Sequence, residues 1–149
     1  MKNNMQMRTL CSLGRAWCYG ALGVLALAGS MVWAADKEAK PVDISKLPPA
    51  STNKVVFVKE IEPILKKACL DCHGPDAQMG EYRLDKREAA LKGGDKGEAI
   101  IPGKSEKSPF IHYVAGLVKG MEMPPSPDDR LKKEEIGLLR AWIDQGAKW

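Results

Sequence analysis

Five consecutive residues, Cys69-Leu70-Asp71-Cys72-His73, combine two thiols with an imidazole. This C-x-x-C-H spacing is the attachment pattern of a c-type haem. The two thiols can each add to a vinyl group on one edge of a porphyrin, which gives two thioether bonds. The imidazole of His73 can then bind the iron as the proximal ligand, because histidine is one of the few side chains that hold haem iron.

The same cysteine spacing occurs in other kinds of site, and none of them fits the rest of the chain as well. A redox dithiol usually lies at a helix start beside a βαβ pattern, and the sequence shows no such pattern. A zinc site needs a second pair of ligands, and no other close Cys or His pair follows. A disulfide between Cys69 and Cys72 would stabilise little, because the entropic gain grows with loop length. The pattern therefore favours covalent attachment of one haem c.

The start of the chain has the pattern of a secretory signal. Basic residues come first, and an uncharged run over residues 16–35 follows and contains small side chains at its end. We predict a signal peptide over residues 1–34, cleaved after Ala34. The alternative is an uncleaved anchor, because residues 16–35 are numerous enough to span a bilayer. Either outcome predicts a periplasmic or otherwise exported domain, in the compartment where bacteria attach haem c.

Charge and cysteine usage narrow the range of functions. The net charge is +4, but without the three basic residues of the signal the chain has 20 basic and 19 acidic residues. No basic stripe with interleaved aromatic side chains is present, so nucleic-acid binding is not expected. Cys11 and Cys18 fall within the signal and have no expected role. Cys69 and Cys72 are then the cysteines of the exported part.

Hydrophobic periodicity predicts helices on both sides of the haem motif. Residues 35–54 are polar and contain three prolines, which predicts a flexible linker or an arm on the surface before a domain at 55–149. The predicted helices run from about residues 59–61 to Cys69, from Lys86 to Lys92 after an Asp85 cap, from Pro109 to Leu117 after a Ser108 cap, and over 132–145. Trp142 and Leu139 of the last helix are expected to pack on the helix that ends at Cys69.

A second stretch with useful chemistry is Gly120-Met121-Glu122-Met123-Pro124-Pro125. A soft thioether suits the sixth position of haem iron, and a methionine opposite a histidine raises the reduction potential. The prolines after Met123 restrict the backbone there, which would keep the sulfur in place. Met123 is therefore the favoured sixth ligand, with Met121 and Met79 as alternatives. Met79 lies only six residues after His73, which makes the opposite face of the haem hard to reach.

Several separated motifs occur in the order seen in one family. They are Ile61-Glu62-Pro63-Ile64-Leu65, Cys69-x-x-Cys72-His73-Gly74-Pro75, Arg83-Leu84-Asp85, Ile101-Pro102-Gly103, Met123-Pro124-Pro125 and Trp142-Ile143-Asp144-Gln145-Gly146-Ala147. The chain from Val55 to Trp149 thereby resembles the planctomycete-type cytochrome c domain, a branch of the class I cytochrome c superfamily. Two departures are Lys132, where a Thr or Ser commonly caps the last helix, and Glu81, where a small Gly is usual.

This resemblance implies an all-α, single-domain cytochrome c fold around one covalently bound haem. It implies attachment through Cys69 and Cys72, with His73 as the proximal and Met123 as the distal iron ligand. A domain of this kind, standing without a large fused region, points to a small carrier of single electrons rather than an enzyme. Its redox partner proteins would then bind through small, transient contacts.

Two other functions are alternatives to electron transfer. A haem enzyme or sensor needs an open or displaceable sixth position for peroxide or a gas, and distal polar groups. The Met-Pro-Pro loop argues against that function, and no distal His or Arg is evident in the sequence. A haem-bearing interaction module within a larger assembly is the second alternative. Membrane association is expected only if residues 16–35 stay uncleaved.

Overall fold

The computed structural model describes residues 41–149. The predicted signal peptide or anchor over residues 1–34, together with Cys11 and Cys18, lies outside the described residues. The described part belongs to one compact unit, Ala39–Trp149, and it contains helices and isolated bridges but no strand. The predicted all-α class is therefore confirmed for this part of the chain. None of its helices is long and apolar enough to cross a membrane.

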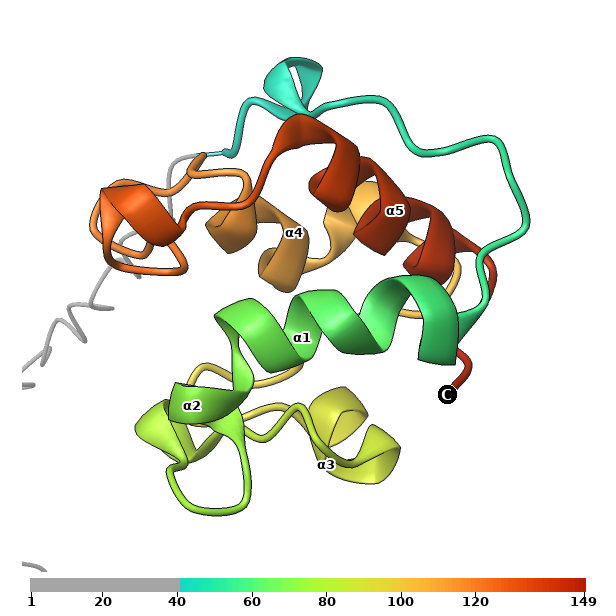
Figure 1. The fold of residues 1–149 in the computed structure, drawn as a ribbon. Helices are drawn as coiled ribbons and strands as arrows, with labels where there is room; N and C mark the ends of the chain where they lie inside the picture. Colours follow the sequence, from blue (N-terminus) through green and yellow to red (C-terminus); the bar gives the residue numbers. More distant parts are fainter. Residues whose placement is uncertain (1–40) are drawn as a thin grey trace, which may run out of the picture. The chain divides into compact units, whose positions relative to one another are not determined.

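Five α-helices alternate with shorter helical turns along the described residues. The α-helices are α1 (Glu62–Ala68), α2 (Leu70–His73), α3 (Arg87–Lys92), α4 (Pro109–Val114) and α5 (Lys133–Asp144). The shorter turns are η1 (Ile44–Lys46), η2 (Phe57–Ile61), η3 (Met79–Glu81), η4 (Ser105–Lys107) and η5 (Pro127–Asp129). Figure 1 shows α1 across the middle of the unit, with α4 and α5 on one side of it and α2 and α3 on the other.

The helix that leads into the haem motif begins with a π-helical turn. This turn, η2, starts at Phe57 and continues directly into α1, so helical backbone begins two residues before the predicted start. Pro63 lies in the first turn of α1, as predicted, where its missing N–H has no partner to lose. Cys69 ends α1 with its N–H donating to the Leu65 carbonyl at 2.9 Å, and α2 follows at once. Helical backbone therefore leads up to and across the C-x-x-C-H residues.

The predicted helix at residues 86–92 is present as α3, but its predicted cap is wrong. Its N-cap residue is Lys86, whose side chain makes no capping hydrogen bond. The carboxylate of Asp85 instead accepts hydrogen bonds from Arg83 Nε at 2.8 Å and Arg83 Nη2 at 2.5 Å. A charged bidentate partner is stronger than a neutral backbone N–H, which explains why Asp85 does not cap the helix. Gly93 ends α3 with a φ of 84°, as expected for a glycine after a helix.

The predicted helix after Ser108 is present as α4, but it is shorter than predicted. Ser108 is its N-cap residue, yet its hydroxyl makes no capping bond and instead accepts the Ile101 N–H at 2.9 Å. The helix ends at Val114 rather than at Leu117. Gly116 has a φ of 66°, a left-handed conformation that stops the helix before the predicted end.

The last helix, α5, agrees with the prediction within one residue at each end. Lys132 precedes it, and its backbone N–H donates to the Glu135 carboxylate at 2.7 Å. This bond is one half of a capping box, so the start of α5 is satisfied without a Thr or Ser. Trp142 stacks at 5.8 Å between ring centroids on Phe57 of η2. The predicted packing of α5 on the helical segment that ends at Cys69 is therefore confirmed.

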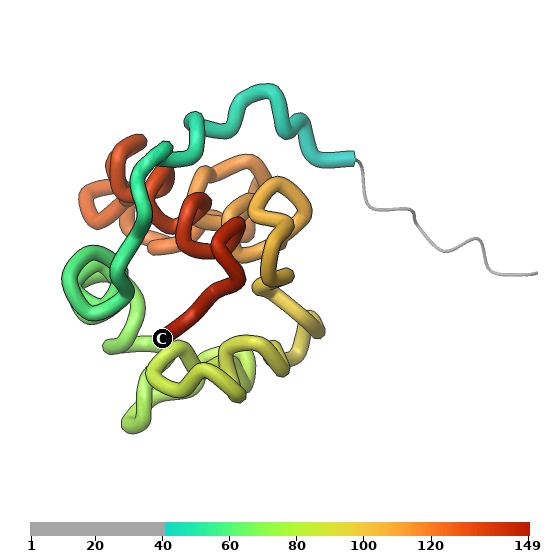
Figure 2. The backbone as a smooth tube through the Cα atoms, turned by 90° about the vertical axis from the view of Figure 1, so that its right-hand side faces the viewer, coloured from blue at the N-terminus to red at the C-terminus, as the bar shows by residue number. Residues whose placement is uncertain are grey.

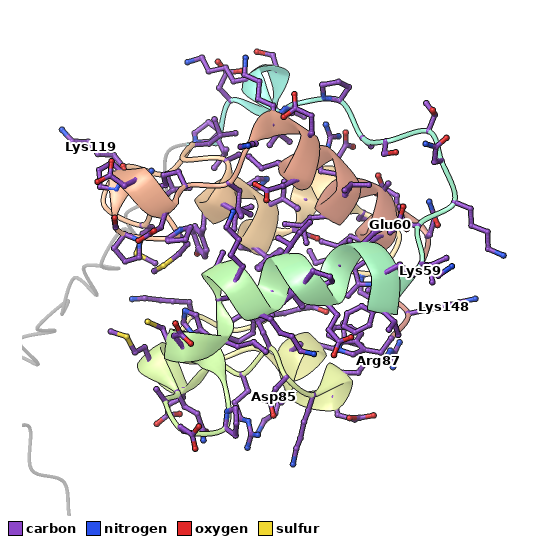
Figure 3. The ribbon with its side chains drawn as sticks, in the orientation of Figure 1. Lys59, Glu60, Asp85, Arg87, Lys119 and Lys148 are labelled. Atoms are coloured by element: carbon purple, nitrogen blue, oxygen red, sulfur yellow. The ribbon has the colours of Figure 1, made fainter. Side chains whose placement is uncertain are left out.

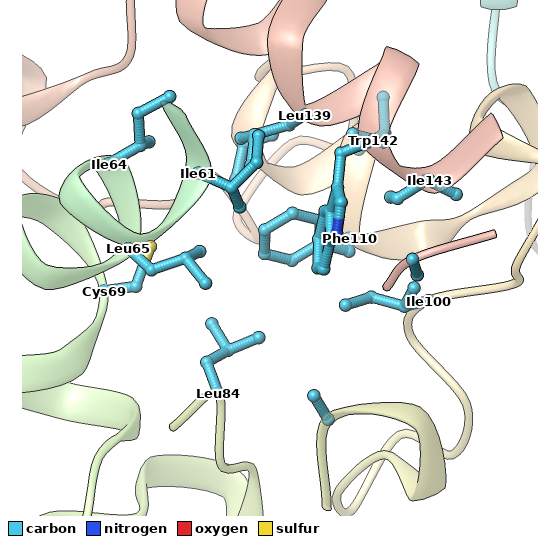
Figure 4. Close-up of a cluster of buried hydrophobic side chains, with 14 of the residues drawn as sticks. Ile61, Ile64, Leu65, Cys69, Leu84, Ile100, Phe110, Leu139, Trp142 and Ile143 are labelled. Carbon is cyan, nitrogen blue, oxygen red and sulfur yellow. The ribbon is translucent and has the colours of Figure 1, made fainter. Parts of the chain in front are cut away.

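One apolar cluster fills the unit and includes the first cysteine of the motif. Its members from different elements include Ile61, Leu65, Cys69, Leu84, Ile100, Phe110, Leu139, Trp142 and Ile143. Figure 4 shows these side chains directed toward one another from α1, α4, α5 and the loops beside α3. Because Cys69 belongs to this cluster, the haem motif is attached to the core at its N-terminal end.

Residues 41–54, called the arm below, lie along α5 rather than apart from the unit (Figures 1 and 2). The Ser51 N–H donates to the Gly137 carbonyl at 3.0 Å, in the middle of α5. At the end of α5, the side-chain amide of Gln145 donates to the Asn53 carbonyl at 2.9 Å. The described part of this segment is thus bonded to α5 at the surface of the unit. Its bonds to α5 connect residues about ninety positions apart, which local composition does not reveal.

Candidate functional site

The two cysteines and the histidine of the motif lie on one helical turn. The N–H groups of Cys72 and His73 both donate to the Cys69 carbonyl, at 3.2 and 2.8 Å. Both thiols are free, and the Cys69 side chain is buried while that of Cys72 is exposed. Burial, with a smaller effect of nearby Cys72, raises the pKa of Cys69 to about 12. Its thiol is therefore protonated at neutral pH.

The imidazole of His73 is half-buried, and one of its nitrogens has no partner. Its Nδ1 atom is buried and accepts or donates no hydrogen bond within residues 41–149. The backbone of His73 is held from outside the motif, because the Leu84 N–H donates to its carbonyl at 2.8 Å. A buried polar atom without a partner costs about 1–3 kcal/mol, so the ring suits a residue that meets a group from outside the polypeptide.

Tyr82 contacts the imidazole and was not among the predicted site residues. Its ring meets that of His73 edge-on, with 5.6 Å between the centroids and 66° between the planes. The Tyr82 hydroxyl donates to the Ala90 carbonyl at 3.2 Å, and burial raises the pKa of this phenol. The tyrosine is nine positions from the histidine, and only the turn between them brings the two rings together. No local pattern in the sequence indicates this contact.

Met123 lies on a different segment from the other three predicted site residues. Its side chain is half-buried against the apolar cluster, and its N–H donates to the Tyr113 carbonyl at 3.1 Å. Met79 is 61% exposed, and Met121 is half-buried but does not pack on the cluster. Among the three candidates, Met123 is therefore the methionine held against the core. Figure 1 shows the loop after α4 at the same end of the unit as α2.

Charged side chains brace the segment that carries Met123, residues 120–125, called the Met loop below. The Glu122 carboxylate accepts the Gly120 N–H at 2.9 Å, and Arg130 Nη2 donates to the Pro125 carbonyl at 3.3 Å. Backbone N–H groups of Glu122 itself and of Gly120, together with the charge of Arg130, lower the pKa of Glu122. The sequence offers no signal for this role of Arg130, because turn residues of this kind are usually solvated.

The donor atoms suit a haem better than a bare metal ion. Within residues 41–149 there is no group of three or more His, Cys, Asp or Glu side chains that would hold a metal ion by itself. The predicted site residues instead offer two thiols, an imidazole and a thioether. Thiols serve for covalent attachment to a porphyrin, and an imidazole and a thioether are known axial ligands of its iron. The residues therefore fit a c-type haem.

Comparison with known proteins supports the same conclusion. A family model described as Planctomycete cytochrome C matches residues 69–127, from the first cysteine of the motif to just beyond the Met loop. No match was found among curated proteins or among solved structures. A cytochrome c domain implies covalently bound haem c, in agreement with the donor atoms described above. The match over residues 69–127 therefore supports a planctomycete-type cytochrome c domain in this chain.

Proposed function

We propose that this protein is an exported carrier of single electrons, with one haem c attached through Cys69 and Cys72 and its iron held by His73 and Met123. The observation that carries the proposal is the single helical turn with both thiols and a half-buried imidazole, whose Nδ1 has no hydrogen-bond partner within residues 41–149. When bound, the haem supplies the chemistry, a one-electron change at the iron. The chain supplies the ligands and the apolar surroundings.

The two thiols attach the cofactor from different environments. Each S–H would add across a vinyl group of the haem, so that a sulfur–carbon bond would form and the thiol hydrogen would pass to the other vinyl carbon. Cys69 carries its sulfur within the apolar cluster, whereas Cys72 carries its sulfur at the surface. One edge of the cofactor would therefore be bonded to the core through Cys69 and to the surface of the unit through Cys72.

Backbone hydrogen bonds restrict the two proposed axial ligands. The turn around His73 is fixed by its N–H bond to Cys69 and by the bond from Leu84 to its carbonyl. Met123 is fixed at its own N–H by the Tyr113 carbonyl. Two protein ligands leave no vacant position for a substrate, which favours a carrier over a haem enzyme or sensor. Fixed ligands would also keep the movement of the ligand side chains small when the iron gains or loses an electron.

Export and partners belong to the same proposal. The basic start of the chain and its uncharged run over residues 16–35 support export to the periplasm or a similar compartment. Redox proteins of that compartment are the expected partners, in small and short-lived complexes. If residues 16–35 stayed uncleaved, they would hold the carrier at the membrane surface and leave the chemistry of the haem unchanged.

Optical spectra of the ferric and ferrous protein test the ligands and thereby the function. We expect a low-spin haem c with a sulfur-to-iron charge-transfer band that is lost in Met123→Ala. Met121→Ala is the matched control, because it removes a half-buried thioether two residues away and should leave the band intact. A high-spin ferric iron, or a spectrum that Met123→Ala leaves unchanged, would favour the enzyme or sensor instead.

A further inference from the structure

One arginine connects the two ends of the segment that contains the Met loop. Arg130 Nη2 donates to the Pro125 carbonyl at 3.3 Å. Its Nη1 atom lies 3.6 Å from the position that a Cβ atom on Gly116 would occupy, just after α4. The guanidinium therefore reaches from Gly116, two residues after the end of α4, to Pro125, the last residue of the Met loop.

Glu122 lies beside the same glycine and also helps to hold the Met loop. Its Cγ atom is 4.0 Å from the Cβ position at Gly116, and its carboxylate accepts the Gly120 N–H at 2.9 Å. The opposite charges of Glu122 and Arg130 attract each other. In the sequence, Met123 directly follows Glu122 and lies two residues before Pro125. Arg130 acts on both Glu122 and Pro125.

The arginine occupies this place although one of its donors is unsatisfied. Arg130 Nε is buried and has no hydrogen-bond partner in the part of the chain that the structure describes. An unpaired buried donor opposes the gain from the other contacts, so the guanidinium is expected to add little to overall stability. Its consequence is local, because its hydrogen bond is to Pro125, the last residue of the Met loop.

We propose that Arg130 is a positioning residue for Met123, holding the Met loop so that the thioether stays at the iron. This inference rests on the proposed His73/Met123 ligation. The planar fork of arginine places Nη1 beside Gly116 while Nη2 donates to Pro125, and the single ammonium of lysine cannot occupy both places. Loss of the fork would free the loop and make the sulfur easier to displace from the iron.

Titration of the ferric holoprotein with imidazole measures how easily the sulfur is displaced. We expect Arg130→Gln and Arg130→Lys to bind imidazole roughly tenfold more tightly than the wild type, about the value of one hydrogen bond from a charged donor. Met123→Ala should bind imidazole more tightly still. Adding Arg130→Gln to Met123→Ala should change nothing further, because no sulfur is left to hold.

Arg87→Gln is the matched control for the arginine variants. Arg87 Nε also donates to a backbone carbonyl, that of Ala147, at 3.2 Å. Figure 3 shows Arg87 and Lys119, a residue just before the Met loop, at opposite ends of the unit. This control should keep the wild-type imidazole affinity, and circular dichroism should show native helix content in every variant compared.

The outcomes separate the inference from the function on which it rests. Wild-type affinity in both Arg130 variants, with tighter binding in Met123→Ala, would overturn the role of Arg130 and leave the ligands in place. An equal gain from Arg130→Gln with and without Met123 would also overturn it. Wild-type affinity in Met123→Ala would instead refute Met123 as the ligand.

Discussion

Cys69 and Cys72 lie in different environments although only two residues separate them. One thiol belongs to the apolar cluster and the other is exposed to solvent. Either sulfur alone can form one thioether bond, so we expect the single variants Cys69→Ala and Cys72→Ala to retain covalent haem. The double variant should lose all of it to acidified organic solvent, as measured by absorbance of the extract. Cys18→Ala is the control and should retain covalent haem; extraction-resistant haem in the double variant would refute the attachment.

The ion pair between Arg83 and Asp85 makes a pH-dependent contribution to stability. Hydrogen bonding by Arg83 lowers the pKa of Asp85 below its ordinary value of 3.8. Because the folded-state pKa is the lower one, the contribution is present above about pH 4 and is lost as the pH falls through the folded-state pKa. We expect Arg83→Gln to lower the melting temperature at pH 7 and to lower it less at pH 3. Lys92→Gln, an exposed change nearby, should show no such pH dependence, and an equal loss at both pH values would contradict the prediction.

Sequence-based prediction at the residue scale depends on how local the signal is. The C-x-x-C-H spacing is contained within five residues and needs no knowledge of the fold. Asp85 was assigned as a cap because its competing partner, Arg83, is a side chain whose direction the sequence does not show. The contact of Tyr82 with His73 was not predicted, because turns on both sides decide that contact.

Helices with a strong apolar stripe were predicted well, whereas the bonds between the arm and α5 were not. α5 has such a stripe, and its ends were predicted within one residue. The arm is held by backbone groups, such as the Ser51 N–H bonded to Gly137, and backbone groups have no sequence pattern. A glycine inside a helix is normally unfavourable. The glycine at position 137 of α5 has a structural reason, because a Cβ there would lie 2.8 Å from the Pro49 carbonyl oxygen of the arm.

Gly137→Ala tests whether the arm is part of the folded unit. Alanine favours a helix over glycine by about 1 kcal/mol, but the added Cβ must displace the arm and its bond from Ser51. Overpacking of this kind typically costs about 1–3 kcal/mol, so we expect a net loss of stability. Urea unfolding would measure that loss, and limited proteolysis should cut the arm faster. Glu134→Ala, an exposed change on the same helix, is the control; a stabilised Gly137→Ala would show that the arm contributes nothing.

At the scale of the whole unit, α1 lies between two sides of unequal packing (Figure 1). On one side, α4 and α5 pack on each other and on η4, and α5 also packs on η2 at the start of the α1 segment. On the other side, α2 and α3 make few contacts with α4 or α5, and Leu84 and Ala90 connect this side to the core. The motif residues Cys72 and His73 belong to this less packed side. The haem is therefore expected to stabilise the side that the protein core supports least.

Hydrogen exchange can show this unequal dependence on the haem. The Cys69→Ala/Cys72→Ala variant, compared before and after extraction of its haem and refolding, provides both states in one sequence. Residues 70–92 should lose protection to a much greater extent than α5, because regions with few buried contacts open at the lowest free energy. The α5 amides serve as the internal control, since Ile136, Leu139 and Ile143 are buried in the core without any cofactor. Equal loss of protection in both regions would instead mean that the haem supports the unit as a whole, and that the two sides fold and unfold together.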